Sequence, residues 1–335
     1  MEIRRKIADG TFEYADYFPE SPKAKKSAAT STKMEDLLAM QLARYKKQVD
    51  NGKLSPSTYK GYYKSLTGER MQHWHGKDVE EVTPASLRAW VSEMDCTSKA
   101  IRNMLIPIRS VFEDALNDGI IVSNPFDQIA LIKLIRQTSK ASDYAIQPFT
   151  HEERQAILNA CRSDELAMYQ FWFNTELRPG ELQALEWRHI DFDKATARIE
   201  QNQVAGVIKT PKTAAGIRAV DLNAEAMAAL RAQKPISMLR DGRVFLNPAT
   251  LEPWQTDAQI RKNSWLPLMK RAGIEYRNPY QIRHTYASSL LTAGANPWYI
   301  ADQMGHADVT MVFKTYGKFI REDFQKPKAV LRVVV

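Results

Sequence analysis

The chain has 335 residues, of which 44% are hydrophobic and 26% charged, a composition typical of a globular protein with about two domains. No uninterrupted apolar run reaches the roughly 20 residues that a membrane-spanning helix needs, and the first residues form no apolar signal segment, so we expect a cytoplasmic protein without membrane association. The formal net charge of +8 and the pI of about 9.3 favour a polyanionic partner.

Residues 1–30 are predicted to be an incomplete unit that runs into a linker. Residues 9–19 mix turn signals with aromatic side chains, whereas residues 21–33 are small, polar and basic, which is linker composition. Three lysines of this linker are candidates for contact with phosphate groups of a nucleic acid: Lys23, Lys25 and Lys26.

Residues 31–137 are predicted to form a small domain of about four helices. Pro56 and Pro84 follow Ser and Thr at two helix starts, where proline is favoured. Residues 98–117 have a clear hydrophobic period of 3.6, and Pro107 inside this run predicts a kink or break.

Basic and aromatic residues alternate in the helix expected after Pro56. Lys60 and Lys64 flank tyrosines at helical spacing, which suits contact with a nucleic-acid groove. A solvated helix face explains each lysine equally well, so both interpretations stay open at this point.

Residues 138–148 are a second hinge, and residues 149–335 form a larger domain. Thr150 and Glu153 make a capping box at its first helix. Strands are expected at residues 197–204, 217–222 and 244–246, with a basic loop that carries Lys209 and Lys212 between the first two. The apolar end of the chain, residues 330–335, is another strand candidate.

The stretch from Tyr280 to Tyr316 holds an unusual set of polar residues. Three short helices are expected here, punctuated by glycines, and they bring an arginine, two histidines and a tyrosine towards one point. Guanidinium, imidazole and phenol groups together can react with a phosphate, although each alone also has an ordinary structural role. The residues are Arg283, His284, His306 and Tyr316.

In this order the motifs resemble the tyrosine recombinase family of the phage-integrase type. The resemblance covers residues 30–325 and rests on five stretches: Thr175 to Leu182 with Arg178, Pro211 to Thr213 followed by Arg218 to Leu222, Tyr280 to Ser288, Met304 to His306, and Tyr316. The family's second arginine box usually reads His-x-x-Arg, and here Tyr280 replaces that His. The resemblance implies a mainly α fold with a small antiparallel β-sheet, made of a helical core-binding (SAM-like) domain and a mixed α/β catalytic domain.

The resemblance also implies a division of roles. Arg178 and Arg283 would hold the phosphate, Lys212 (or Lys209) would protonate the leaving oxygen, and His306 would hydrogen-bond the transition state. Tyr316 would be the nucleophile and form a 3′-phosphotyrosine. We expect supporting roles for Glu181, His284 and Tyr280, and the tyrosine at position 280 leaves the proton acceptor for Tyr316 open.

The family implies integration and excision at double-stranded DNA attachment sites by a homo-tetramer, with no cofactor, metal or ATP. The two cysteines, Cys96 and Cys161, have no metal-ligand spacing and are expected to be reduced. A host DNA-bending protein and an excisionase are further expected partners. Residues 330–335 would either add a strand to a neighbour's sheet or pack on their own domain. The opening resembles the end of an arm-site DNA-binding domain, which suggests a shortened or degenerate copy.

Two alternatives remain for the activity. A type IB topoisomerase-like nicking and closing enzyme would share the chemistry but would not recombine two DNA sites. A helical DNA-binding regulator without catalysis would bind DNA equally well without Tyr316 and would never link to it covalently.

Overall fold

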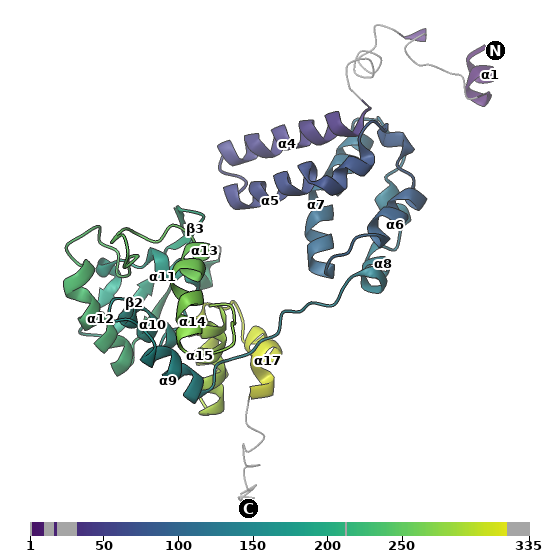
Figure 1. Cartoon of the computed structure of the whole chain (residues 1–335). Helices are drawn as coiled ribbons and strands as arrows, with labels where there is room; N and C mark the ends of the chain where they lie inside the picture. The colour runs from purple at the N-terminus through teal and green to yellow at the C-terminus, as the bar shows by residue number, and fades with distance from the viewer. Residues whose placement is uncertain (1, 10–16, 19–31, 212, 320–335) are drawn as a thin grey trace, which may run out of the picture. The chain divides into compact units, whose positions relative to one another are not determined.

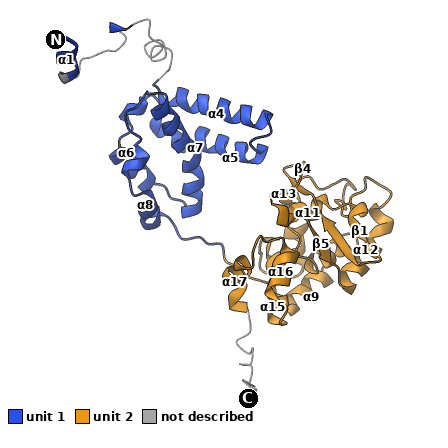
Figure 2. Ribbon diagram, turned by 180° about the vertical axis from the view of Figure 1, so that it is seen from behind, with its two compact units in different colours: residues 1–144 blue, residues 145–335 orange. Residues whose placement is uncertain are grey.

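The computed structural model describes residues 2–9, 17–18, 32–211 and 213–319 (Figure 1). The chain divides into two compact units, residues 1–144 and 145–335, each with its own hydrophobic core (Figure 2). The division falls inside the linker expected at residues 138–148. The fold is mainly helical with small antiparallel sheets, as the sequence predicts, while the functions assigned to the domains stay predictions.

Unit 1 is entirely helical in its described part. Ser55 and Thr83 cap the starts of α5 and α6, because each side chain accepts a hydrogen bond from a backbone N–H three residues on. Trp74 and Trp90 meet edge to face in the core at 5.4 Å between ring centroids. The helices are α1 (Glu2–Ala8), α4 (Met34–Asp50), α5 (Pro56–Thr67), α6 (Pro84–Ser92), α7 (Ser98–Asn117) and α8 (Leu131–Thr138).

α7 runs from Ser98 to Asn117 through Pro107, so the break expected there does not occur, while the kink stays a prediction. Proline removes one backbone hydrogen bond and costs roughly 3 kcal/mol within a helix. The helix nevertheless buries a continuous apolar face, which includes Ile101, Ile108 and Phe112, and packs against α4 and α5. Burial of several large side chains, at about 1.5–3 kcal/mol each, outweighs the proline.

Unit 2 surrounds two small antiparallel sheets with helices. The larger sheet has the strand order β1-β2-β5 (Ile190–Asp191, Thr196–Ile199, Arg218–Asp221). A second sheet pairs β3 (Asn202–Val204) with β4 (Val207–Lys209). The capping box at Thr150 and Glu153 is confirmed. The helices are α9 (His151–Asn159), α10 (Leu166–Phe173), α11 (Pro179–Ala184), α12 (Ala224–Ser237), α13 (Asp257–Ile260), α14 (Leu266–Arg271), α15 (Gln281–Thr292), α16 (Pro297–Met304) and α17 (Thr310–Tyr316), and a π-helical turn spans Arg261–Trp265.

Two strand predictions need correction. Residues 197–204 do not form one strand, because β2 pairs with β5 while β3 turns away at residues 200–201 to pair with β4. Ala205 and Gly206, both at positive φ, make the tight turn of that second hairpin. Residues 244–246 form no strand: their side chains are buried in the core, and Leu246 makes only an isolated bridge to Pro253. The short apolar run at residues 244–246 therefore indicated a buried segment and not a strand of a sheet.

Candidate active site

Arg178 lies where α10 gives way to α11, directly before Pro179. The residue before a proline favours extended backbone, and Arg178 has ψ 152°, so its side chain leaves the helix start. Its backbone N–H donates to Oε2 of Glu181 at 3.0 Å, and its Nη1 donates to Oε1 at 2.7 Å. Glu181 thus fixes both the backbone and the guanidinium of Arg178.

A second arginine, Arg218 on β5, completes a buried charge network beneath Arg178. Its Nη1 and Nη2 donate to Oε1 and Oε2 of Glu181 at 3.2 and 3.0 Å, and Nη2 also donates to Oε1 of Glu176 at 3.3 Å. Burial by itself raises the pKa of Glu181, but Arg218 and Arg178 outweigh it and the pKa is lowered. Glu181 is therefore an anion that two guanidinium groups share.

Arg283 is almost completely buried on the first turn of α15, with 1% of its surface exposed. It donates to the main-chain carbonyls of Glu176 and Met304, the latter at 2.6 Å, and its Nη2 lies 3.2 Å from Nε2 of His306. Burial, followed by the charge of Arg178, lowers the pKa of Arg283. The two guanidiniums are thus close enough to repel, which is the situation that a bound anion relieves.

His306 follows Gly305, and Gly305 explains where His306 lies. Gly305 ends α16 in the left-handed conformation at φ 63°, and a Cβ there would lie 2.8 Å from the main-chain oxygen of Ala215. The chain can approach the loop before β5 only because this residue has no side chain. Burial and the charges of Arg283 and Arg178 lower the pKa of His306 to about 4, so the imidazole is neutral at pH 7.

Tyr316 is the last residue of α17, and its side chain is 2% exposed. Its hydroxyl oxygen lies 2.8 Å from Nδ1 of His284, the residue after Arg283. Burial and the neighbouring Arg283 lower the pKa of His284 to about 4, so this imidazole is also neutral at pH 7. A neutral imidazole can accept a hydrogen bond from the phenol, which a protonated one cannot.

Tyr280 packs between these two halves of the site. Its ring meets the ring of His284 edge-on at 5.2 Å. Burial lowers the pKa of Arg178, but Glu181 first, and Tyr280 after it, outweigh this effect and raise that pKa. Arg178, Tyr280, His284 and Tyr316 therefore form a connected series of side chains. Tyr280 therefore interacts with the guanidinium of Arg178 and with the imidazole of His284. No hydrogen bond joins Tyr280 to the hydroxyl of Tyr316 among the described residues.

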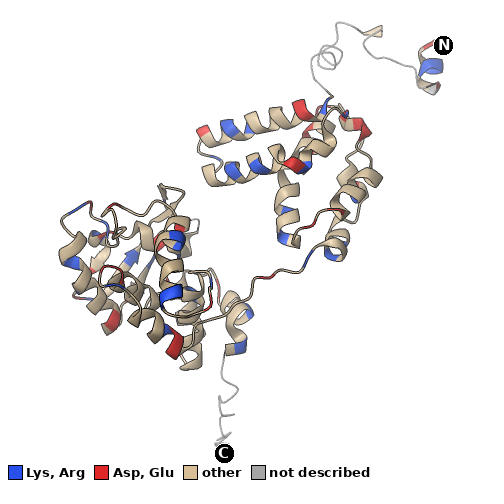
Figure 3. Ribbon diagram, viewed as in Figure 1, with Lys and Arg blue, Asp and Glu red and all other residues tan. Residues whose placement is uncertain are grey.

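The structure leaves several predicted residues untested. Lys212, the linker lysines Lys23, Lys25 and Lys26, and the tail strand at residues 330–335 lie outside the described residues. Lys209 ends β4 and is half-buried. Lys60 and Lys64 are exposed one turn apart on α5, which carries no acidic residue and is marked by basic segments in Figure 3.

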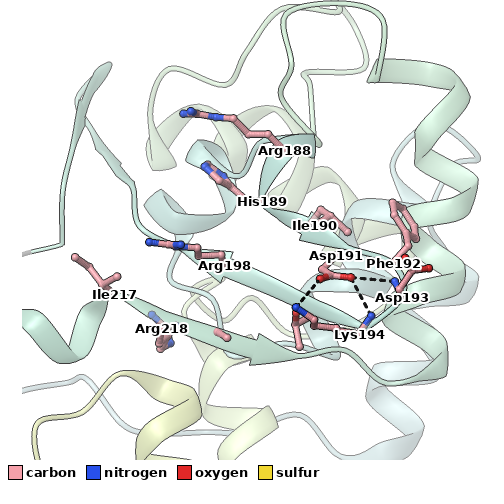
Figure 4. A pocket seen from close by; sticks show the side chains of 12 residues that line it. Arg188, His189, Ile190, Asp191, Phe192, Asp193, Lys194, Arg198, Ile217 and Arg218 are labelled. Atoms are coloured by element: carbon pink, nitrogen blue, oxygen red, sulfur yellow. Dashed lines mark hydrogen bonds and ion pairs between the residues drawn. The ribbon is translucent and has the colours of Figure 1, made fainter.

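An open cavity of about 970 Å³ lies over β1, β2 and β5 and borders the cluster at Arg218 (Figure 4). Arg188, Arg198 and Ile217 are exposed side chains of its lining, and Asp191 pairs with Lys194 at its floor. Arg218 also borders the cavity but directs its guanidinium towards Glu176 and Glu181. The buried cluster is the stronger candidate site, because guanidinium, imidazole and phenol groups converge there.

Two residues of the network had no predicted role. In the sequence, Arg218 belongs to one of the motifs and Glu176 lies near Arg178, but neither pattern predicts a role for the side chain. The available signal for Glu176 was a carboxylate two positions before the arginine predicted to be catalytic. No group of metal-ligating residues and no helix able to span a membrane occurs among the residues that the structure describes.

Residues 147–319 match the phage integrase family, and residues 1–22 match an arm DNA-binding domain. The first match spans more than half of the chain, so the chain belongs to the phage integrase family, whose members are tyrosine recombinases.

Two curated relatives come from Escherichia coli (strain K12). The chain is 30% identical to the putative defective protein IntQ, over 97% of its own length and 89% of that protein. It is 28% identical to the prophage integrase IntR, over 95% of its own length and 84% of that protein.

Solved structures share the fold. The Tn1549 transposon integrase in complex with a circular intermediate DNA has a TM-score of 0.70 and 20% identity, over 85% of this chain and 95% of that one. A lambda integrase tetramer bound to a Holliday junction has a TM-score of 0.61 and 16% identity, over 91% and 88%. At these identities the similarity concerns the fold alone.

Proposed function

We propose that the protein is a site-specific DNA recombinase that cuts and rejoins DNA through a 3′-phosphotyrosine, for integration and excision of a phage genome. The observation that carries the proposal is the pair of contacts made by neighbouring residues of α15: Arg283 contacts His306, and His284 contacts Tyr316. A guanidinium that would bind the phosphate and the nucleophile that would attack it are thereby held from adjacent positions on one helix.

In the proposed reaction, Arg178 and Arg283 donate to the non-bridging oxygens of the scissile phosphate, with His306 as a third donor. The phenolic oxygen of Tyr316 forms a bond to phosphorus, and the bond from phosphorus to the 5′ oxygen breaks. The proton of the phenol passes to Nδ1 of His284, which fills the role left open by Tyr280. Attack of a 5′-hydroxyl on the phosphotyrosine reverses these steps and restores the phosphodiester.

The leaving 5′ oxygen needs a proton, and we propose Lys212 as its donor, with Lys209 as the second candidate. A lysine ammonium on the loop between β4 and β5 suits this role, because Gly305 and Arg218 tie the end of that loop to the site. Lys60 and Lys64 on α5 are proposed contacts to DNA phosphates, together with the linker lysines.

Exchange of strands between two duplexes needs four active sites, so we propose a tetramer on DNA. Lambda integrase was crystallised as a tetramer bound to a Holliday junction. The tail strand proposed to join a neighbour's sheet would pair at β1, since β5 is covered: the side-chain amide of Gln303 on α16 bonds to the N–H of Asp221 at 2.8 Å and to the carbonyl of Ala219 at 3.4 Å. Deletion of residues 328–335 should then weaken tetramer assembly, and unchanged assembly and recombination would refute this part.

A second candidate is a DNA-binding protein of the same family without catalysis. The name of IntQ, a putative defective protein, is the observation that favours it. The two candidates differ in one property, the covalent link between Tyr316 and DNA.

The test uses a library of nicked duplexes with a randomised core, because a nick lets the leaving fragment diffuse away and traps the covalent complex. Wild-type protein and Tyr316→Phe are incubated with the library and resolved on a denaturing gel. We expect a shifted protein–DNA band with wild type alone, and sequencing of the captured DNA identifies the target. Absence of the band with wild type, despite DNA binding by both proteins, would favour the non-catalytic candidate.

A further inference from the structure

Glu176 lies at the point where the supports of both proposed phosphate-binding arginines meet. It stands two residues before Arg178, and its main-chain carbonyl accepts a hydrogen bond from Nη1 of Arg283. Its carboxylate oxygen Oε1 accepts from Nη2 of Arg218 at 3.3 Å, and Arg218 also binds Glu181, the partner of Arg178. A change in the charge of Glu176 therefore alters the electrostatic environment of both Arg178 and Arg283.

The carboxylate is poorly suited to a permanent negative charge. The side chain of Glu176 is 0% exposed, and Oε2 has no hydrogen-bond donor within the part of the chain that the structure describes. A buried anionic oxygen without a donor is far less stable than the neutral acid. Burial raises the pKa of Glu176 to about 7, although Arg218 and Arg283 oppose the shift.

Charged and titratable side chains from several elements surround the carboxylate of Glu176. Arg218 and Arg283 favour its ionised form, and Glu181 opposes it. Two tyrosines, Tyr286 on α15 and Tyr299 on α16, also sense its charge. The ionised and the protonated forms of Glu176 are therefore close in free energy, and a further anion nearby favours the protonated form.

The net charge of the cluster depends on this one proton. The guanidiniums of Arg178, Arg218 and Arg283 face the carboxylates of Glu176 and Glu181, which leaves one net positive charge when both carboxylates are ionised. Protonation of Glu176 leaves two. A phosphodiester brings one negative charge, and attack on phosphorus builds further charge on its non-bridging oxygens.

We propose that Glu176 is a positioning residue that takes up a proton from solvent when the scissile phosphate enters the site. Of the two carboxylates that Arg218 contacts, Glu181 alone then stays ionised. The site gains a second net positive charge, which stabilises the negative charge on the phosphate oxygens. The proton returns to solvent when the DNA leaves. This inference rests on the proposed function, and the experiments below separate the two.

The first experiment measures single-turnover formation of the covalent complex on the captured duplex between pH 6 and 9. Glu176→Gln imitates the protonated acid, and Glu275→Gln removes the same charge from an exposed position as the control. We expect the rate ratio of Glu176→Gln to wild type to rise with pH, by up to roughly tenfold per unit above the apparent pKa. The ratio for Glu275→Gln should stay constant.

A merely structural role for Glu176 predicts a different pattern, because a damaged site loses rate by the same factor at every pH. A ratio independent of pH, with a functional wild type, would overturn the inference and leave the proposed function intact. No covalent complex with wild type at any pH would instead contradict the proposed function.

The second experiment needs neither cleavage nor a substitution at Glu176. Tyr316→Phe protein is titrated with the captured duplex by calorimetry at about pH 7.5–8, above the pKa raised by burial, in buffers of different ionisation enthalpy. The slope of the observed enthalpy against buffer enthalpy gives the protons taken up. We expect net uptake that is lost in Tyr316→Phe/Glu176→Gln, and no uptake in Tyr316→Phe would overturn the inference even if Glu176→Gln fails to fold.

Discussion

Nδ1 of His284 lies 2.8 Å from the phenolic oxygen of Tyr316, and both side chains are buried. The histidine follows Arg283 on α15, whereas the tyrosine ends α17, 32 residues further along the chain. The contact links the proposed nucleophile to the helix that supplies a phosphate-binding guanidinium. It also offers the phenol a neutral imidazole as proton acceptor.

Replacement of His284 by Phe should slow cleavage. Phe keeps an aromatic ring at this position but removes the imidazole nitrogen that contacts the hydroxyl of Tyr316. Removal of a positioned acid–base group lowers rates by about 100-fold or more. Single-turnover cleavage of the captured duplex measures the effect, with DNA affinity as the control. An unchanged or faster rate would mean that the hydrogen bond only holds Tyr316 in its buried position and that His284 accepts no proton during cleavage.

Loss of Glu181 should damage the site and the fold together. Glu181→Gln leaves Arg178 and Arg218 without their shared anion, and breaking a buried ion pair costs about 3–5 kcal/mol. We expect this loss in urea unfolding, together with weaker cleavage. Asp50→Asn removes an exposed pair with Lys46 and should change stability by no more than about 1 kcal/mol. Equal losses of unfolding free energy for Glu181→Gln and Asp50→Asn would contradict a stabilising role for the buried network.

Gly305→Ala should destabilise the chain and displace His306. The left-handed conformation costs a non-glycine residue about 1–2 kcal/mol, and the new methyl group would also meet the oxygen of Ala215. Gly294 has φ 85° with open space around it, so Gly294→Ala carries the conformational cost alone. We expect Gly305→Ala to be the less stable in thermal unfolding and the only one of the two that reduces cleavage.

Acid should destabilise unit 2 through its two neutral histidines. The pKa of His284 and that of His306 are both about 4 in the folded chain, below the ordinary value of 6.5, because burial and Arg283 disfavour the charged imidazole. Their contribution to stability is complete above pH 6.5 and is lost as the pH falls towards 4. Urea unfolding across this range should show a smaller loss for His306→Gln than for wild type. Parallel curves would argue against the shifted pKa.

The lysines of α5 should contribute to DNA affinity without sequence preference. Each phosphate contact releases counterions, so Lys60→Ala/Lys64→Ala should flatten the slope of log affinity against log salt by about two. Fluorescence anisotropy with an unrelated duplex provides the measurement. Lys46→Ala is the control, because Lys46 already pairs with Asp50. Identical salt slopes for the double variant and wild type would place the DNA-binding face elsewhere.

Local features of the sequence were sufficient to predict the starts and ends of several helices. The side chains of Ser55, Thr83 and Thr150 cap helices by accepting from backbone groups three residues away, so each cap lies within one short stretch of sequence. Likewise, proline after Arg178 and the left-handed Gly305 after α16 act on their immediate neighbours. Interactions of such short range can be inferred without knowledge of the fold.

Only the tertiary structure decided which side chains meet. The contact of Tyr316 with His284 and the sharing of Glu181 by two arginines join segments that are distant in sequence. Complete burial leaves one carboxylate oxygen of Glu176 without a donor among the described residues. The division of residues 197–204 between two sheets likewise depends on which strands lie alongside. Sequence patterns report the polarity of a position, whereas its partners and its pKa are set by packing around it.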